Sequence, residues 1–174
     1  MCGRYTLKAS PEALQEAFEI AEMPDGWRQR WNVAPTQAAP IIANRPAAGG
    51  RRIPEAFRWG LVPAWAKDMT IASRLINARA ETADSKPSFR VALQRRRCLV
   101  LADGYYEWRA AGNEKIPTWI HRPDERPFAM AGLWERWQKE DDAVLFTFTI
   151  LTSAANETLA RVHHRMPVIL DRES

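Results

Sequence analysis

Apolar and β-branched residues gather in short runs along the chain, and most of these runs have the length and alternation typical of β-strands. We expect strands at residues 3–7, 40–43, 53–61, 98–102, 117–121, 127–134, 143–152 and 167–170. Residues 40–43 and 53–61 are expected to form a hairpin across a loop rich in Gly and Pro, residues 44–52. Residues 127–134 and 143–152 are expected to form a second hairpin across the charged loop 135–142.

Helical spacing is confined to a few short segments between these strands. Ser10 followed by Pro11 is a good helix start, because Ser caps the free N–H groups and Pro suits the first turn. Apolar residues then recur at positions 14, 17, 18 and 21, the stripe of an amphipathic helix. We expect further helices over residues 87–96 and from Asn156 to residue 162, whereas residues 71–83 fit a loop or a short helix equally well.

The order of these elements favours an α+β fold in a single domain, residues 1–174. Strands and helices are interspersed without the regular strand–helix–strand alternation of parallel sheets, so we expect a mostly antiparallel sheet with short flanking helices. A chain of 174 residues is long enough to bury a core of its own.

The composition of the chain argues against several classes of protein. No apolar run approaches the ~20 residues of a membrane span, and the N-terminal residues lack the pattern of a signal peptide. We therefore expect no membrane partner and a location in the bacterial cytosol or nucleoid. The formal net charge of +4 permits an anionic partner without requiring one. The run 95–97 is three arginines, which suit phosphate groups but are also common at solvated helix ends.

The cysteine and histidine content argues against disulfides and metals. The chain has two cysteines, Cys2 and Cys98, too few for a secreted disulfide framework. Cys98 lies in an apolar strand-like run and is expected to be a buried structural residue. Two cysteines and three histidines at these spacings do not form a metal-ligand pattern, and we expect neither a metal nor another cofactor.

Cys2 carries the most distinctive candidate chemistry, because it directly follows the initiator methionine. Removal of Met1 would leave Cys2 with a free α-amine and a thiol on adjacent carbons. The amine can condense with an aldehyde, and the thiol can then close the imine into a thiazolidine ring. An α-amine has a pKa of about 7.7–8.0, so a useful fraction is neutral and nucleophilic near pH 7. The alternative is that Cys2 is simply a small apolar residue at the start of a strand.

Three polar residues lie in apolar or aromatic settings, Asn77, Glu107 and His163. A carboxyl group packed between aromatic rings loses solvation, so Glu107 is a candidate proton shuttle. A histidine titrates near neutral pH and could serve the same reaction. Each has an ordinary alternative: a turn residue for Asn77, an arginine's ion-pair partner for Glu107, and a hydrogen-bonded core residue for His163.

Tryptophan is unusually frequent, with eight in the chain. Four of them, Trp31, Trp59, Trp65 and Trp108, lie beside Pro, Gly or Arg rather than within long apolar runs. Bases of single-stranded nucleic acid stack on such rings, and interleaved arginines can hold the backbone. Packing in the core is the alternative for each ring.

As a set, several motifs resemble the SRAP family, the SOS-response-associated peptidases. They are Met1-Cys2-Gly3-Arg4-Tyr5, Trp31-Asn32-Val33-Ala34-Pro35, Trp59-Gly60-Leu61-Val62-Pro63, residues 76–82 (INARAET), residues 102–108 (ADGYYEW) and His163-His164-Arg165-Met166-Pro167. No single motif is specific, but the set runs in order through almost the whole chain.

The resemblance implies an open-barrel fold and a protein that cross-links itself to single-stranded DNA at an abasic site. Carried over by position, the resemblance makes Cys2 the nucleophile, Asn77 the residue that orients the opened sugar, Glu107 the acid/base and His163 the residue that assists the Schiff base. It implies DNA contacts by Arg4, Asn32, Trp65, Arg79, Thr152 and Arg165.

Two further functions stay open. Cys2 could be the nucleophile of an N-terminal-nucleophile peptidase that acts on itself or on other proteins, as the family name suggests. The chain could also be a non-covalent single-strand-binding module. The resemblance implies a C-terminal helix and strand beyond Ser174, and the ring chemistry requires loss of Met1. We expect a monomer.

Overall fold

The computed structural model describes residues 2–45, 52–139 and 143–170. Its strands are β1 (Arg4–Leu7), β2 (Arg30–Val33), β3 (Ala38–Ala43), β4 (Pro54–Trp59), β5 (Asn77–Arg79), β6 (Arg97–Ala102), β7 (Gly104–Ala111), β8 (Glu114–Ile120), β9 (Phe128–Trp137), β10 (Leu145–Ala154), β11 (Arg165–Pro167) and β12 (Ile169–Leu170). Its helices are short: α1 (Pro11–Phe18), α2 (Arg90–Arg95), α3 (Glu157–Ala160) and the 3-10 helices η2 (Met69–Arg74) and η3 (Ala80–Thr82).

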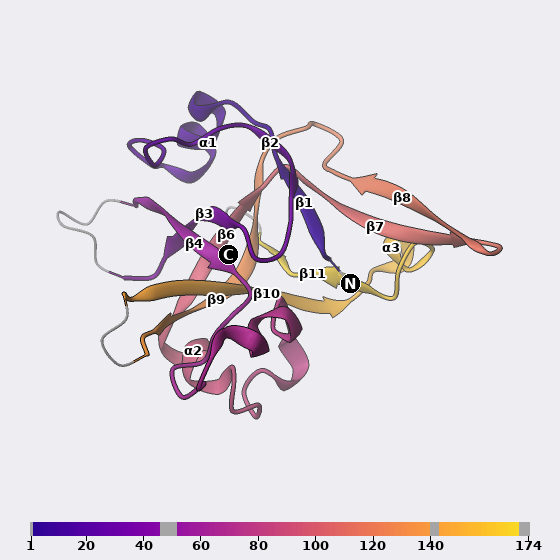
Figure 1. The fold of residues 1–174 in the computed structure, drawn as a ribbon. Coiled ribbons are helices and arrows are strands. Elements are labelled where there is room, and N and C mark those ends of the chain that lie inside the picture. The colour runs from indigo at the N-terminus through magenta and orange to yellow at the C-terminus, as the bar shows by residue number, and fades with distance from the viewer. Residues whose placement is uncertain (1, 46–51, 140–142, 171–174) are drawn as a thin grey trace.

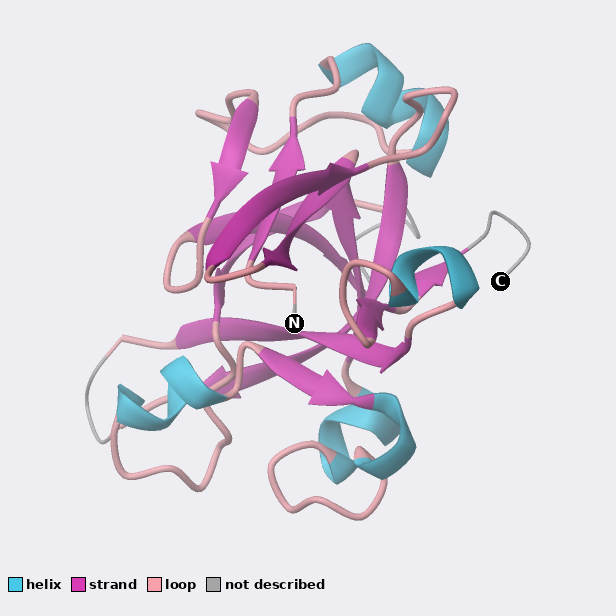
Figure 2. Ribbon diagram, turned by 90° about the vertical axis from the view of Figure 1, so that its right-hand side faces the viewer, coloured by secondary structure: helices cyan, strands magenta, loops and turns pink. Residues whose placement is uncertain are grey.

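Five strands close into a barrel. The larger sheet has the order β11-β10-β4-β3-β6-β9-β12, and an additional pairing of β9 with β10 completes the ring β10-β4-β3-β6-β9. Strands β2, β1, β7 and β8 form a second, antiparallel sheet. Strands β6 and β7 are separated by a single residue, so the chain passes from the barrel into the second sheet at one corner (Figure 1). In the turned view of Figure 2, the segment that leads into β1 starts within the ring of strands.

This architecture confirms the α+β expectation and corrects several details. The strand pairs are mostly antiparallel, as expected, and the exceptions are β10 with β4 and β10 with β5, which run parallel. Strand β7 was not expected, because its Gly, Tyr and Glu residues do not form an apolar run. The second hairpin exists, but β9 continues to Trp137, so its loop is shorter than residues 135–142. Residues 140–142 of that loop, and 46–51 of the expected loop 44–52, lie outside the described residues.

The starts of α1 and α3 were predicted correctly, whereas α2 begins three residues later than expected. Ser10 accepts a hydrogen bond from the backbone N–H of Ala13 at 3.2 Å, and Asn156 caps α3 in the same way. Helix α1 stops at Phe18 because Glu19 adopts a left-handed conformation with φ 56°, which ends the apolar stripe before position 21. Helix α2 spans Arg90–Arg95 rather than residues 87–96. None of the helices among the described residues is both long and apolar enough to cross a bilayer.

The core continues from the barrel into the second sheet. Trp59 is fully buried and packs against Tyr5 of β1 and Phe148 of β10, with ring centroids 5.3 and 6.2 Å away. Its indole N–H donates to the backbone carbonyl of Ile76 at 2.8 Å. Trp59 is therefore a core residue, which corrects its candidacy as a base-stacking ring.

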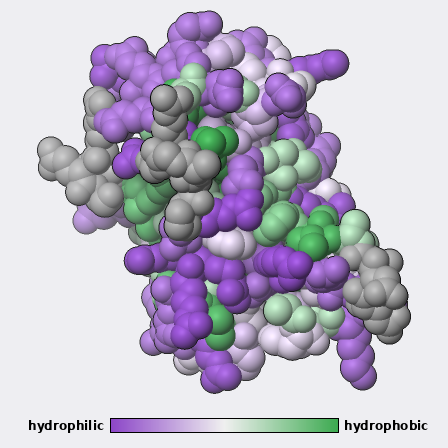
Figure 3. Space-filling view, turned by 90° about the vertical axis from the view of Figure 1, so that its left-hand side faces the viewer, coloured by the Kyte–Doolittle hydropathy of each residue, from purple (hydrophilic) through white to green (hydrophobic). Residues whose placement is uncertain are grey.

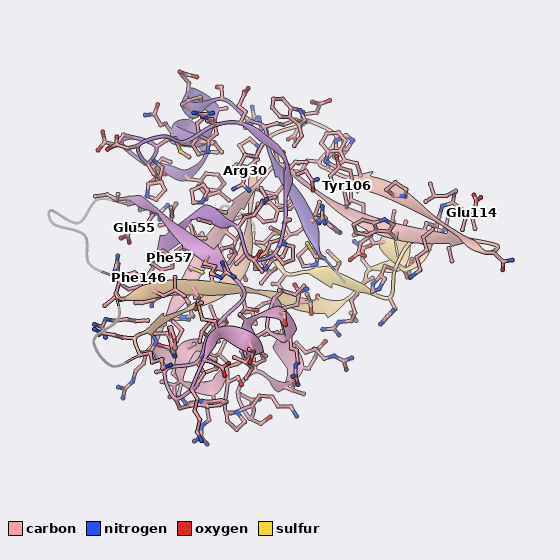
Figure 4. All side chains as sticks on the ribbon, viewed as in Figure 1. Arg30, Glu55, Phe57, Tyr106, Glu114 and Phe146 are labelled. Carbon is pink, nitrogen blue, oxygen red and sulfur yellow. The ribbon has the colours of Figure 1, made fainter. Side chains whose placement is uncertain are left out.

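A cation is held among aromatic rings near the start of β10. The guanidinium carbon of Arg45 lies 4.7–5.7 Å from the ring centroids of Phe57, Trp134 and Phe146, and its nitrogens are paired with Glu55. Figure 4 shows Glu55, Phe57 and Phe146 together, away from the β7–β8 hairpin. Such cation–π contacts stabilise the position of the guanidinium. Elsewhere, polar side chains dominate the face in Figure 3, with apolar atoms in separate patches.

Asp103 fixes the corner between the two sheets. Its buried carboxylate accepts hydrogen bonds from the Thr6 hydroxyl at 2.5 Å and from the backbone N–H groups of Lys8 and Ala9 at 2.5 and 2.6 Å. These bonds anchor the end of β1, the strand that begins two residues after Cys2. Losing the carboxylate would leave buried donors without partners, the costliest way to lose a hydrogen bond.

We expect Asp103→Ala to lower the free energy of unfolding by about 3 kcal/mol, because each orphaned buried donor costs roughly 1–3 kcal/mol. Asp103→Asn should lose less, since the amide oxygen still accepts. Urea unfolding at constant pH measures both values. Equal stability of Asp103→Ala and the parent chain would contradict this account of the corner.

Candidate functional site

The site is built around Cys2, which the fold places inside the molecule. The Cys2 side chain is fully buried and belongs to the core shared by the barrel and the second sheet. The amide of Asn77 donates a hydrogen bond to the Cys2 carbonyl oxygen at 2.8 Å. Asn77 opens β5, which pairs with β10 and matches Asn77 to Ile150. A side-chain amide on a paired strand therefore fixes the backbone of Cys2.

Glu107 reaches the same interior because side chains alternate along a strand. Tyr105 and Glu107 of β7 are buried, 1% and 2% exposed, whereas Trp108 is 38% exposed. The register pairs Tyr5 of β1 with Tyr105, so both point to the same face, toward the core. Burial raises the pKa of the Cys2 thiol well above its usual value, and the Glu107 carboxylate raises it further. The thiol is therefore held protonated, with a carboxylate nearby.

The surroundings of Cys2 contain polar groups that the described protein atoms do not fully use. The hydroxyls of Tyr5 and Tyr105 and the Oδ1 atom of Asn77 are buried without a hydrogen-bond partner among the described residues. Burial raises the pKa of Tyr105, and the neighbouring Cys2 and Glu107 raise it further. Buried polar atoms are normally paired, so this interior has spare capacity to bind a polar ligand.

His163 lies between α3 and β11, and the backbone of Arg165 holds its ring. The Arg165 N–H donates to His163 Nδ1 at 3.0 Å, so in the neutral ring Nδ1 is the acceptor and Nε2 carries the proton. The Arg165 carbonyl oxygen lies 3.2 Å from the same nitrogen. The His164 ring stacks on His163 with centroids 4.3 Å apart. The ring of His163 is therefore oriented by its own loop.

Strand β10 connects the segments that carry Asn77 and His163. Its C-terminal end pairs with β5 on one side, Thr152 opposite Arg79, and with β11 on the other, Thr152 opposite Pro167. Asn77 thus lies on one flank of β10, and His163 lies two residues before the strand on the other flank. The hydrogen bond from Asn77 to Cys2 brings the start of the described chain to the same end of β10.

Four of the six expected DNA contacts have side chains that reach the surface. Arg4 of β1 donates to the side-chain oxygen of Asn32 on β2 at 3.0 Å, and Arg79 is exposed at the end of β5. Trp65 is 60% exposed. It lies on a turn closed by a hydrogen bond from the Ala66 N–H to the Pro63 carbonyl oxygen. The surface candidates are thus an arginine tethered to an asparagine, an exposed arginine and an exposed ring.

Thr152 and Arg165, the other two, lie below the surface. Thr152 is fully buried, and its hydroxyl lies 3.4 Å from the Ala78 carbonyl and 3.2 Å from Arg165 Nη2. The Arg165 side chain is 12% exposed and forms two hydrogen bonds with Glu81. Their contacts with DNA stay predictions, and in this structure both groups are occupied by protein atoms.

Two residues of interest were missed from the sequence, Tyr105 and Glu81. The spacing of Tyr105 and Glu107, two residues apart in an extended segment, was the available signal for a shared face. Glu81 lies within the INARAET motif but carried no role of its own. Among the described residues, no group of three or more His, Cys, Asp or Glu side chains could hold a metal ion.

Comparison with known proteins gives one consistent family. The model of the SOS response associated peptidase (SRAP) family matches residues 1–174. The abasic site processing protein YoqW of Bacillus subtilis is 43% identical over all of this chain and 78% of its own length. The abasic site processing protein HMCES of Gallus gallus is 34% identical over 98% of this chain and 62% of its own.

Solved structures agree in fold. A crystal structure of a protein from Bacteroides thetaiotaomicron superposes with a TM-score of 0.86 at 32% identity, covering 99% of this chain and 78% of that one. A second, from Bordetella bronchiseptica, has a TM-score of 0.79 at 30% identity, covering 98% of this chain and 84% of that one.

Proposed function

Because the chain belongs to the SRAP family, we propose that it binds single-stranded DNA at abasic sites and cross-links itself to the lesion through Cys2. The names of its relatives support abasic-site DNA as the substrate class. The observation that carries the covalent step is the hydrogen bond from Asn77 to Cys2, with Glu107 buried in the same interior. The adduct would shield the lesion during the response to DNA damage.

The proposed chemistry needs an aldehyde and both functional groups of an N-terminal cysteine. The α-amine attacks C1′ of the ring-opened sugar, and loss of one water molecule gives an imine. The Cys2 thiol then adds to the imine carbon, and its proton is transferred, through the site, to the imine nitrogen. Aldehyde plus aminothiol thus gives thiazolidine plus water, with no net oxidation. The step requires removal of Met1, which lies outside the described residues.

Each neighbouring side chain suits a different step of this reaction. The Asn77 amide holds the Cys2 carbonyl, which leaves its Oδ1 atom to accept a hydrogen bond from the sugar. Glu107 accepts the proton of a thiol that burial keeps protonated. His163, with its proton on Nε2 in the neutral form, donates to the hydroxyl oxygen on C1′ as that oxygen leaves as water.

The DNA strand would lie across the surface residues already described. Arg79 and Arg4 would bind phosphates, Asn32 would contact the backbone, and the exposed Trp65 ring would stack on a base. Arg165 would bind a phosphate only by releasing Glu81.

The test is a denaturing gel. Protein freed of Met1 is mixed with a single-stranded oligonucleotide containing one abasic site, and a slow band that survives denaturation is the expected result. The same oligonucleotide without the lesion should give none. Equal salt-sensitive binding to both oligonucleotides without any covalent band would favour a non-covalent module. Cysteine-dependent cleavage of added peptides without a DNA adduct would favour a peptidase.

Arg79→Ala should weaken non-covalent binding and reduce its salt dependence. Loss of one phosphate contact lowers the slope of log K against log salt by about 0.7 for single-stranded DNA. Arg122→Ala is the control, because Arg122 is paired with Asp124 on an exposed turn. Fluorescence anisotropy over a salt series measures both. An unchanged slope in Arg79→Ala would remove Arg79 from the interface.

A further inference from the structure

Arg165 is held through both of its terminal nitrogens, whereas its buried Nε atom has no hydrogen-bond partner among the described residues. Its Nη1 and Nη2 atoms donate to the two carboxylate oxygens of Glu81 at 2.7 and 2.9 Å, the parallel geometry in which Arg binds carboxylates best. Nη2 also donates to the Thr152 carbonyl oxygen at 2.6 Å and lies 3.2 Å from the Thr152 hydroxyl. The guanidinium is thus fixed in position and in rotation.

The pair joins the two segments that carry site residues. Glu81 belongs to η3, which directly follows β5 and lies four residues after Asn77. Arg165 begins β11 and lies two residues after His163. Between these segments runs β10, whose Thr152 is bonded to the same guanidinium. The Glu81–Arg165 pair is therefore a brace from the Asn77 side of β10 to the His163 side.

The backbone of Arg165 is also the local support of the His163 ring. When His163 is neutral, Nδ1 accepts from the Arg165 N–H at 3.0 Å. When His163 is protonated, the same nitrogen carries a proton, which the Arg165 carbonyl oxygen at 3.2 Å can accept. In both charge states, the orientation of the His163 ring therefore depends on the position of the Arg165 backbone.

We propose that Glu81 is a positioning residue: by holding the Arg165 guanidinium, it fixes the Arg165 backbone and hence the orientation of the His163 ring. The effect on cross-linking rests on the proposed function, whereas the effect on the ring concerns this fold alone. Glu81 does not touch the reacting atoms in this account. It acts only through Arg165.

The surroundings distinguish this brace from an ordinary surface ion pair. Arg122 and Asp124 are also joined by two hydrogen bonds, but they lie two residues apart with side chains 46% and 42% exposed. Arg165 and Glu81 are 84 residues apart in sequence, and the Arg165 side chain is only 12% exposed, although Glu81 itself is 50% exposed. The hydrogen bonds from Arg165 lower the pKa of Glu81 to about 2, so the carboxylate stays charged through the neutral range.

The first experiment measures the tautomer of the His163 ring in the absence of DNA. Long-range 1H–15N spectra of the neutral imidazoles should show His163 with Nδ1 unprotonated and Nε2 protonated in the parent chain. Glu81→Gln keeps the shape of the side chain but loses its charge and half of its acceptor pattern, so we expect a mixture of the two tautomers. Arg165→Lys, which keeps the charge but not the planar fork, should give the same result. Asp124→Asn is the matched control and should leave the His163 signals unchanged.

The second experiment measures the rate of cross-linking. In single-turnover assays with an abasic oligonucleotide, Glu81→Gln should cross-link about 10- to 100-fold more slowly, because small displacements of catalytic groups have effects of this order. Non-covalent affinity should change by less than about threefold, since no phosphate contact is lost. Thermal unfolding confirms that the variant is folded.

Two results would overturn the proposal. One is an unchanged His163 tautomer in both Glu81→Gln and Arg165→Lys. The other is tighter DNA binding with faster cross-linking in Glu81→Gln, which would make Glu81 a competitor of phosphate for Arg165. A parent chain that forms no adduct would end the proposed function, yet the tautomer measurement would still decide whether Glu81 positions His163.

Discussion

Cys2→Ala in protein freed of Met1 is expected to abolish the denaturation-resistant adduct with abasic DNA. The variant keeps an N-terminal amine, so it can still form an imine, but it has no thiol to close the ring. An imine hydrolyses during denaturation, whereas a thiazolidine holds the sugar carbon through two bonds. Borohydride should therefore rescue a covalent band for Cys2→Ala by reducing the imine.

Cys98→Ala is the matched control. Cys98 is likewise a buried core cysteine whose pKa is raised by burial, and it belongs to the same core cluster. Both substitutions remove one buried sulfur, so both should cost a similar amount of stability, of order 1 kcal/mol. Only Cys2→Ala should lose the adduct. Equal adduct yields from the two variants would remove Cys2 from the mechanism.

Glu107→Gln is expected to slow cross-linking by a factor of about 10²–10⁴, the usual contribution of a general acid–base group. The amide has nearly the same shape but cannot take the thiol proton. Loss of the carboxylate also removes one of the two causes that raise the pKa of Cys2. That pKa should fall, yet stay above its usual value because burial is the larger cause. Easier ionisation of the thiol therefore offsets part of the loss.

Rapid-quench single-turnover kinetics measures the forward rate, and incubation of purified adduct with excess competitor oligonucleotide measures its reversal. Glu135→Gln is the control, because Glu135 is also a buried strand carboxylate but is paired with Arg96. It should cross-link at the parent rate. A parent-like rate in Glu107→Gln, with Glu135→Gln equally unaffected, would exclude Glu107 as the proton acceptor.

Local signals in the sequence predicted those parts of the fold that depend on local chemistry. Ser10 and Asn156 marked helix starts because a capping side chain acts within three residues. Barrel closure was not accessible in the same way. It depends on pairing β10 with both β4 and β9, and on a parallel register that no periodicity encodes. Strand β7 was missed because its inward face carries Tyr105 and Glu107 rather than an apolar run.

The candidate site was predicted residue by residue rather than as an arrangement. Cys2, Asn77 and Glu107 were singled out for their types and settings, and the fold brings them into one buried interior. Of the four candidate tryptophans, Trp59 is a core residue and Trp65 is 60% exposed. The difference arises because Trp59 is the last residue of β4, whereas Trp65 lies beyond the strand. The Glu81–Arg165 brace spans 84 residues, so only the folded chain could reveal it.

The most direct test of the central claim is the identity of the linkage itself. Adduct made with Met1-free protein is digested with protease and nuclease, and tandem mass spectrometry locates the sugar remnant. We predict a remnant on the N-terminal peptide that begins with Cys2, joined to both nitrogen and sulfur, with a mass equal to peptide plus aldehyde minus one water. A remnant on a lysine, on Cys98 or on a peptide that retains Met1 would contradict the account.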